Sequence, residues 1–209
     1  MGIYGQIINS IDSAQAHQAA RITVMKKIEE ITGRRLMVYA ADFSRGTPSN
    51  PCSIHMTDKS GFAELMEGWA GNSVDVLVHS PGGSAEAAEM IVKMLHATFA
   101  DIRFVVPHSA KSAATMLALS GSAVLMDIQS ELGPIDPQVP MALPNGQMMF
   151  VPAQTVLDGF AKAKELLIQE GPAAIPAYMP LLSKYDLHLL EICENAKRLA
   201  RELVYNLMC

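Results

Sequence analysis

The segment Val76-Leu77-Val78-His79-Ser80-Pro81-Gly82-Gly83-Ser84 decides how this chain folds. Its apolar first half is typical of a buried strand, and the strand ends in a turn with two successive glycines. Glycine adopts backbone conformations that are closed to other residues, so Gly82 and Gly83 can point their amides outward from the strand end. Such amides can stabilise a developing oxyanion. Pro-Gly-Gly taken alone is equally typical of an ordinary strand-to-helix turn.

A helix is predicted directly after this turn. Ser84 has the side chain of a helix N-cap, and Glu86 in the first turn complements the helix dipole. Apolar residues then recur at helical spacing, namely Ala85, Ala88, Ile91, Val92, Leu95 and Phe99. A second apolar strand, from Ile102 to Val106, follows. Strands that alternate with helices in this way predict an α/β fold with a mostly parallel sheet and right-handed crossovers.

The second informative segment is Ala110-Lys111-Ser112-Ala113-Ala114. Residues 112–119 carry no charged side chain, which predicts a helix that is buried on all sides and begins near Ser112. A serine at this end of a buried helix is well placed for nucleophilic attack, because the N-terminal amides of the helix stabilise negative charge. The alternative for Ser112 is a helix N-cap, a role that Ser109 can also fill.

Three motifs together resemble the serine dehydrogenase proteinase (SDH proteinase) family. They are His-Ser-Pro-Gly-Gly-Ser at 79–84, Lys-Ser-Ala-Ala-Thr at 111–115 and Glu-Leu-Gly-Pro-Ile-Asp-Pro-Gln at 131–138. The family belongs to a wider group of crotonase-like fold that contains the Clp protease proteolytic subunit and signal peptide peptidase A. The similarity runs from about Ile28 to the C-terminus. Ser-Pro-Gly-Gly is shared across the wider group, whereas the third motif is more specific to the family.

The resemblance implies a serine endopeptidase that hydrolyses peptide bonds. Ser112 matches the nucleophile, Gly82 and Gly83 match the oxyanion-binding turn, and Ala113 matches the residue after the nucleophile, which completes the oxyanion hole. The implied substrate is a peptide or protein, and neither a cofactor nor a metal is implied. Members of the wider group commonly form rings or stacks that shield the cleavage sites, so the resemblance also implies a homo-oligomer.

The general base is left open by the sequence. In the Clp subunit a histidine follows the next strand, but the corresponding stretch 133–137 contains none. Signal peptide peptidase A has a Ser-Lys dyad, and its lysine lies well beyond the serine in the sequence. Here Lys164, or alternatively Lys162, lies in a comparable region. A lysine base needs an apolar setting that lowers its pKa, whereas both lysines fit the solvated face of a helix equally well. Asp136, held between two prolines, is a further alternative, as an orienting group or as part of the substrate groove. His108 is a minor candidate.

Two other classes of function fit the same residues. A crotonase-like acyl-CoA enzyme uses a backbone oxyanion hole to stabilise an enolate and needs no nucleophile. A catalytically inactive, ClpP-like assembly or peptide-binding subunit fits the stretch at 133–137 that contains no histidine. Labelling by a serine-directed reagent would indicate a peptidase, and activity of Ser112→Ala on a thioester would indicate an acyl-CoA enzyme. A lack of labelling by any serine-directed reagent would indicate an inactive subunit.

Composition excludes several kinds of partner. The formal net charge is −5 and the chain has no basic run, which argues against nucleic acid. The 3 cysteines lack Cys-x-x-Cys spacing, so neither a disulfide framework nor a zinc site is indicated, and a reducing, cytoplasmic compartment fits best. No apolar stretch reaches the ~20 residues of a spanning helix, and the N-terminal residues lack the pattern of an export signal.

We expect a single ClpP/crotonase-like domain over residues 1–209, because 209 residues with 50% hydrophobic and 18% charged side chains suffice for one well-buried core. Repeated β-β-α and βαβ units form its sheet, flanked by helices. Residues 1–33 contain an N-terminal helix, 141–151 a projecting hairpin around an Asn-Gly turn, and 153–209 the C-terminal helices. A proline-rich connector joins these helices, and no stop signal precedes Cys209, so we expect the last helix to continue.

Overall fold

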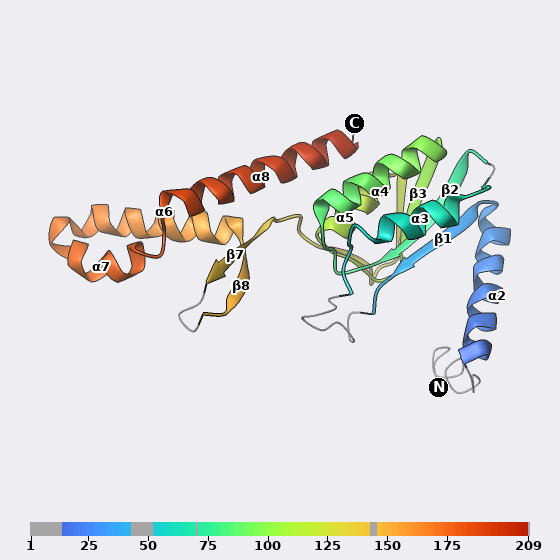
Figure 1. Cartoon of the computed structure of the whole chain (residues 1–209), viewed down its shortest axis with the longest axis horizontal. Coiled ribbons are helices and arrows are strands. Elements are labelled where there is room, and N and C mark those ends of the chain that lie inside the picture. The colour runs from blue at the N-terminus through green and yellow to red at the C-terminus, as the bar shows by residue number, and fades with distance from the viewer. Residues whose placement is uncertain (1–13, 43–51, 70, 143–145, 209) are drawn as a thin grey trace.

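The computed structural model describes residues 14–42, 52–69, 71–142 and 146–208. The first part of the chain forms α2 (Ala14–Thr32), β1 (Arg35–Ala40), α3 (Asp58–Met66), β2 (Ser73–His79), α4 (Ala85–Thr98), β3 (Asp101–Val106), β4 (Ser109–Ala110), α5 (Ala113–Leu119), β5 (Ala123–Met126) and β6 (Glu131–Leu132). The second part forms β7 (Gln138–Ala142), β8 (Met148–Pro152), α6 (Ala153–Glu170), the 3₁₀ helix η2 (Pro172–Ala174), α7 (Ile175–Leu182) and α8 (Leu187–Met208). Figure 1 shows these elements along the chain.

The central sheet is parallel, with strands in the order β1-β2-β3-β5. In the middle strands β2 and β3, every second residue has a fully buried apolar side chain. These residues are Val74, Val76, Val78, Ile102, Phe104 and Val106. The predicted α/β class with a parallel sheet is therefore confirmed. Because the strands are parallel, their carboxyl ends share one edge, and the two informative motifs of the sequence both begin there.

Helices α4 and α5 provide most of the core around this sheet. Helix α4 packs between α3 and α5, and it buries Ala87, Ala88, Ile91, Val92 and Leu95. Ser84 caps it as predicted, since its side chain accepts the Ala87 N–H. Helix α5 is buried along almost its whole length, as its lack of charge predicted. The start of α5 is thus held rigidly against the sheet edge.

Beyond β6 the chain leaves this core and forms what we call the arm, which consists of β7, β8, α6, η2 and α7. Strands β7 and β8 form the expected antiparallel hairpin. The arm packs against α8 through a small apolar cluster that is built from Val139, Ala153 and Val156 of the arm and Cys193 of α8. Figure 1 shows the arm projecting to one side of the sheet, with α8 running back toward α4 and α5. None of the helices in the described ranges is long and apolar enough to cross a membrane.

One element of the second part differs from expectation. The proline-rich segment was predicted only as a connector between helices, but it contains η2 and α7. Pro176 lies in the first turn of α7, where the backbone N–H needs no helical acceptor, so the helix tolerates it. Pro180 lies inside the same short helix. The predictions for residues 1–13, for Asn145 of the hairpin turn and for Cys209 lie outside the described residues.

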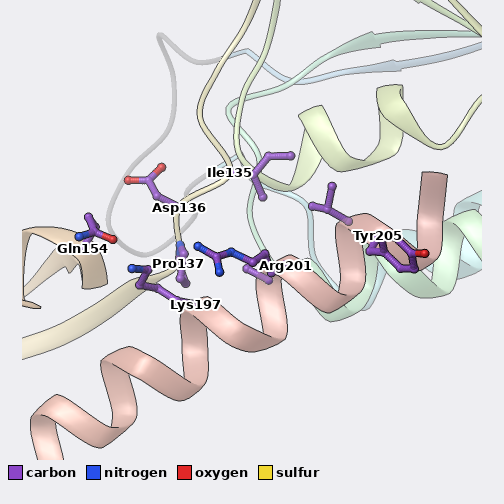
Figure 2. A pocket seen from close by; sticks show the side chains of 9 residues that line it. Ile135, Asp136, Pro137, Gln154, Lys197, Arg201 and Tyr205 are labelled. Atoms are coloured by element: carbon purple, nitrogen blue, oxygen red, sulfur yellow. The ribbon is translucent and has the colours of Figure 1, made fainter. Parts of the chain in front are cut away.

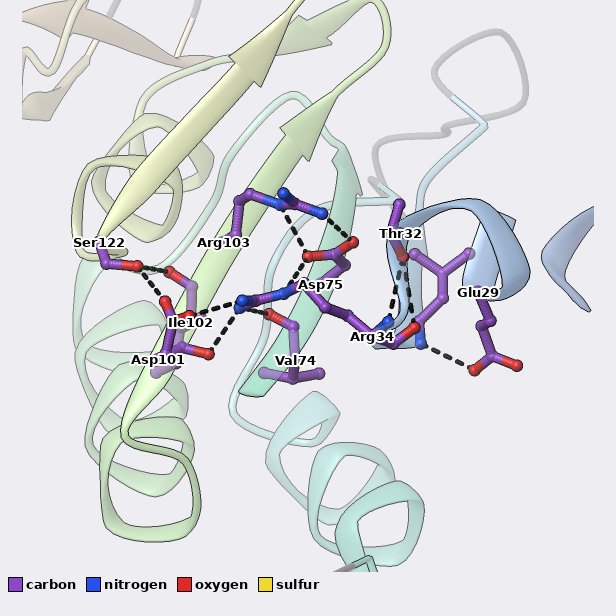
Figure 3. A network of polar contacts seen from close by, with 10 residues as sticks. Glu29, Thr32, Arg34, Val74, Asp75, Asp101, Ile102, Arg103 and Ser122 are labelled. Carbon is purple, nitrogen blue, oxygen red and sulfur yellow. Dashed lines mark hydrogen bonds and ion pairs between the residues drawn. The ribbon is translucent and has the colours of Figure 1, made fainter. Parts of the chain in front are cut away.

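A buried ion cluster closes the opposite end of the sheet, at the amino ends of the strands (Figure 3). Asp75 has no exposed surface, and its two carboxylate oxygens lie 2.8 Å from Arg34 Nε and 2.7 Å from Arg103 Nη2. Arg34 also donates to Asp101, and this hydrogen bond, with one from Ser122, holds the pKa of Asp101 below its ordinary value. A buried carboxylate of this kind is tolerated because cations compensate it.

Candidate active site

Ser112 has an unusual backbone conformation at the junction of β4 and α5. Its φ of 51° and ψ of −121° lie outside the regions that residues with a Cβ normally occupy. Its carbonyl accepts the N–H groups of Thr115 and Met116, at 2.9 and 3.2 Å, so the turn is fixed by the helix that follows. The side chain does not cap that helix, and the hydroxyl makes no hydrogen bond with another described residue. Ser112 thus has a strained backbone and a half-buried side chain, and its hydroxyl has no hydrogen-bond partner among the described residues.

The glycine turn lies directly against this serine. Gly82 and Gly83 have φ values of 95° and 147°. A Cβ on Gly82 would lie 2.8 Å from Ser112 Cβ, closer than folded proteins allow, and would make a tight contact of 3.1 Å with the Ala113 nitrogen. Only glycine therefore permits the two turns to approach each other at this point.

The two glycine amides have different surroundings. The Gly82 N–H donates to Ser80 Oγ at 3.2 Å. On the other side of the turn Ile54 donates to the Gly82 carbonyl at 2.7 Å and accepts the Ser84 N–H at 2.9 Å. The C=O and N–H of one trans peptide unit point in opposite directions, so the Gly83 N–H, which shares a peptide unit with the Gly82 carbonyl, points away from Ile54. No described residue accepts the N–H of Gly83 or that of Ala113, which leaves these two amides free beside Ser112.

Two residues that sequence analysis did not single out hold this arrangement together. Ser80 is fully buried; its N–H donates to the Ser109 carbonyl at 3.1 Å and its carbonyl accepts the Lys111 N–H at 3.0 Å. Thr115 Oγ1 lies 2.8 Å from the Ala110 carbonyl and 2.9 Å from the Gly133 carbonyl. A hydroxyl residue at the end of an apolar strand, just before Pro-Gly, was the available signal for Ser80.

The titratable groups next to the turn are engaged elsewhere. Lys111 Nζ lies 2.6 Å from Glu131 Oε1, and this hydrogen bond lowers the pKa of the Glu131 carboxyl. His79 and His108 stack with their ring centroids 5.6 Å apart. Across the part of the chain that is described, no group of three or more His, Cys, Asp or Glu side chains is placed to hold a metal ion.

The residues predicted as candidate bases lie on other elements. Lys162 and Lys164 are exposed on α6, in the arm, whereas Ser112 opens α5 in the core (Figure 1). The structure does not bring either lysine to the Ser112 hydroxyl within one copy of the chain. Asp136 lies between β6 and β7, where it lines a pocket against α8 (Figure 2). The identity of the base stays a prediction.

A comparison with known protein families agrees with this geometry. Residues 67–168 match the model of the ClpP-like SDH-type serine proteinases. The chain is similar to that family through this segment, which spans just under half of its length. The matched segment contains both glycines of the turn and Ser112, so the resemblance predicted from the three motifs is confirmed.

Curated relatives of this chain include two uncharacterized proteins of Methanocaldococcus jannaschii. One is 44% identical over 66 residues, which are 32% of this chain and 23% of that protein. The other is 29% identical over 135 residues, which are 65% of this chain and 38% of that protein. The chain therefore spans well under half the length of either relative.

Solved structures similar to this chain include two mutant forms of the 1510-N membrane-bound stomatin-specific protease. One is 21% identical with a TM-score of 0.42 over 55% of this chain and 58% of that one. The other, in complex with a substrate peptide, is 23% identical with a TM-score of 0.41 over 55% and 54%. The ClpP protease catalytic domain from Plasmodium falciparum is 16% identical with a TM-score of 0.36 over 55% and 62%.

Proposed function

We propose that the chain is a serine endopeptidase in which Ser112 is the nucleophile. The observation that carries this proposal is the backbone of Ser112, with φ 51° and ψ −121° at a sharp strand-to-helix turn. Such strain persists only where the surroundings impose it, and it is concentrated at functional sites. A serine on a strained turn between a strand and a helix presents its hydroxyl outward, as in the nucleophile elbow of other hydrolases.

The free amides supply the second part of the mechanism. Ser112 Oγ attacks the carbonyl carbon of a peptide bond and passes its proton to a base, while the carbonyl oxygen becomes an oxyanion between the N–H groups of Gly83 and Ala113. The intermediate then collapses, the C–N bond breaks, and the departing amine takes up the proton. Water hydrolyses the resulting ester and frees Ser112. Each oxyanion donor contributes about 10²–10³-fold in rate.

For the base we propose Lys164, with Lys162 and Asp136 as alternatives. The support is the resemblance to a Ser-Lys dyad, because a lysine that loses its charge in an apolar setting can accept the Ser112 proton. Both lysines lie on the exposed side of the arm, so they need an assembly that brings an arm to the Ser112 turn. We therefore also propose a homo-oligomer, which fits the exposed apolar side chains of the hairpin, Met148 at 60% and Phe150 at 65%.

Fluorophosphonate labelling tests the nucleophile. The purified protein, Ser112→Ala and the control Ser84→Ala are treated across neutral and alkaline pH, and the adduct is located by intact mass and peptide mapping. Ser84 is a good control because it is a nearby serine whose hydroxyl already accepts the Ala87 N–H at 3.1 Å. We expect one adduct on Ser112 that grows with pH and is lost only in Ser112→Ala. A folded protein with no adduct at any pH would contradict the proposal.

A peptide-binding or assembly subunit is the second candidate. It is favoured by the hydroxyl of Ser112, which has no base as a hydrogen-bond partner among the described residues. In that case the protein binds peptides without cleaving them, and Ser112→Ala leaves peptide affinity and the oligomeric state unchanged. Light scattering with size exclusion chromatography, on the native chain and on Phe150→Asp, measures the assembly separately from any cleavage.

A further inference from the structure

A pocket of about 860 Å³ opens between α8 and the segment that joins β6 to β7 (Figure 2). Ile135 and Pro137 line one side, and Val204 and Tyr205 of α8 line the other. An apolar pocket with a few placed polar groups is the usual form of a binding site.

Two cationic side chains face this pocket. Lys197 and Arg201 both line it and are one helical turn apart on α8. Arg198, the residue after Lys197, instead lies 4.0 Å from Glu202. Within the described residues no Asp or Glu lies within ion-pair distance of Lys197 or Arg201, and Figure 2 shows the Asp136 carboxylate pointing away from both. The pocket is therefore complementary to an anionic group with an apolar body.

The pocket begins next to the Ser112 turn. The Gly133 N–H donates to the Ala110 carbonyl at 2.8 Å, and a Cβ on Gly133 would lie 3.0 Å from Lys111 Cβ. Ile135 follows two residues later, within about 7 Å along the chain. An extended peptide advances about 3.4 Å per residue, so a chain with its scissile bond at Ser112 reaches the pocket with a nearby residue.

From these contacts we infer that the pocket is a substrate subsite which selects peptides with an acidic residue beside apolar residues, an inference that rests on the proposed peptidase function. Lys197 and Arg201 bind the acidic side chain, and the apolar walls bind its neighbours. Asp136 and Gln154 lie at the opposite rim, where they can accept backbone N–H groups. A peptide offers both a carboxylate and N–H donors, whereas a fatty acid offers only the carboxylate.

Direct binding to Ser112→Ala tests the subsite without any need for cleavage. Three fluorescent peptides of one apolar sequence carry Glu, Gln or Lys at one position, and their affinity is measured by anisotropy at low and high salt. Charge-assisted hydrogen bonds predict that the Glu peptide binds about tenfold more tightly than the Gln peptide. This preference should weaken with salt, since the cations are partly exposed.

Matched variants in the same background locate the preference. Lys197→Ala with Arg201→Ala should abolish it, whereas Arg198→Ala, the neighbouring cation outside the pocket, should keep it. Equal binding of the Glu and Gln peptides, an unchanged preference in the double variant, or displacement of the peptide by decanoate at equal concentration would each overturn the inference. Labelling of Ser112 in the native chain is measured separately. Peptide preference without labelling would support the subsite but contradict the proposed nucleophile, and labelling without peptide preference would do the reverse.

Discussion

Ser80 Oγ accepts the N–H of Gly82 at 3.2 Å inside the turn that faces Ser112. The backbone of the same residue bonds to Ser109 and Lys111, on the segment that leads into Ser112. Ser80 thus connects the glycine turn to the turn of Ser112. Because the Ser80 hydroxyl accepts the Gly82 N–H, the Gly83 N–H is the one left for the oxyanion in the mechanism that we propose. We regard Ser80 as a positioning residue.

Ser80→Ala should slow fluorophosphonate labelling and peptide cleavage about tenfold, since a displaced oxyanion donor loses part of its contribution. The Gly82 N–H then has no acceptor in a buried site, so stability should fall by about 1–3 kcal/mol. The effect on cleavage should be in kcat, with KM little changed. Labelling rates measured well below the melting temperature separate the two effects.

A purely structural role for Ser80 makes the opposite prediction. The variant would then melt earlier but label at the native rate while it is folded. Thr115→Val is the matched control, because it removes another buried hydroxyl that does not touch the glycine turn. That variant should lose stability with a smaller change in labelling rate.

Ser112→Gly should be more stable than Ser112→Ala. Positive φ costs residues with a Cβ about 1–3 kcal/mol, and glycine avoids this cost but loses about 0.5–1 kcal/mol in chain entropy. We therefore expect Ser112→Gly to gain about 1 kcal/mol over Ser112→Ala in urea unfolding, and both variants to lose the fluorophosphonate adduct. Equal stability of the two variants would contradict the strained backbone.

Gly82→Ala should disrupt the candidate site and lower stability. A Cβ at this position would meet the Lys111 carbonyl and Ser112 Cβ, and Gly82 has a φ of 95°. We expect a large fall in melting temperature and no labelling of Ser112. Gly171→Ala is the control, since Gly171 also has a positive φ, at 82°, but a Cβ added there would have no atom of the described residues within 4 Å. A similar fall in melting temperature for both variants would indicate that the loss of stability comes from backbone strain and not from the close approach to Ser112.

Asp75→Ala should destabilise the fold by about 3 kcal/mol, because it leaves Arg34 and Arg103 without their buried partner. Asp101→Ala should cost less, since the Asp101 side chain is 51% exposed. Urea unfolding of both variants measures the difference. The ion cluster lies at the amino ends of the strands, so the folded fraction of Asp75→Ala should still label at Ser112.

Acid should remove the contribution of the Lys111–Glu131 pair. Lys111 lowers the pKa of Glu131 in the folded state, so the stabilisation is present above the unfolded pKa of about 4.3 and is lost as pH falls through the lower folded value. Lys111→Met keeps the stem that packs on Gly133 and removes the charge. Its melting temperature should fall below that of the native chain at neutral pH and converge with it in acid. A gap that stays constant into strong acid, or one that persists at neutral pH when Lys111→Met is made in a Glu131→Gln background, would be at odds with this pair.

Local patterns were sufficient to predict many of the elements. Apolar runs marked β2 and β3, Ser84 marked the start of α4, and the lack of charge after Ser112 marked a buried helix. These features depend on residues close together in the chain. Helix α7 was not predicted, because proline is usually read as a helix breaker, and Pro176 becomes acceptable only in the first turn of a helix.

The sequence by itself determined the parallel α/β core, the glycine turn and a serine at the start of a buried helix, since each rests on local backbone preferences and burial. The tertiary structure decided the positive φ of Ser112 and the hydrogen bond from the Gly82 N–H to Ser80 Oγ. It also decided the direction of the Gly83 N–H, because Ile54 binds the Gly82 carbonyl on the other side of the same peptide unit. It also placed Lys162 and Lys164 on the arm and the cations of α8 beside Ile135. These properties depend on contacts between residues far apart in the chain, which no local pattern encodes.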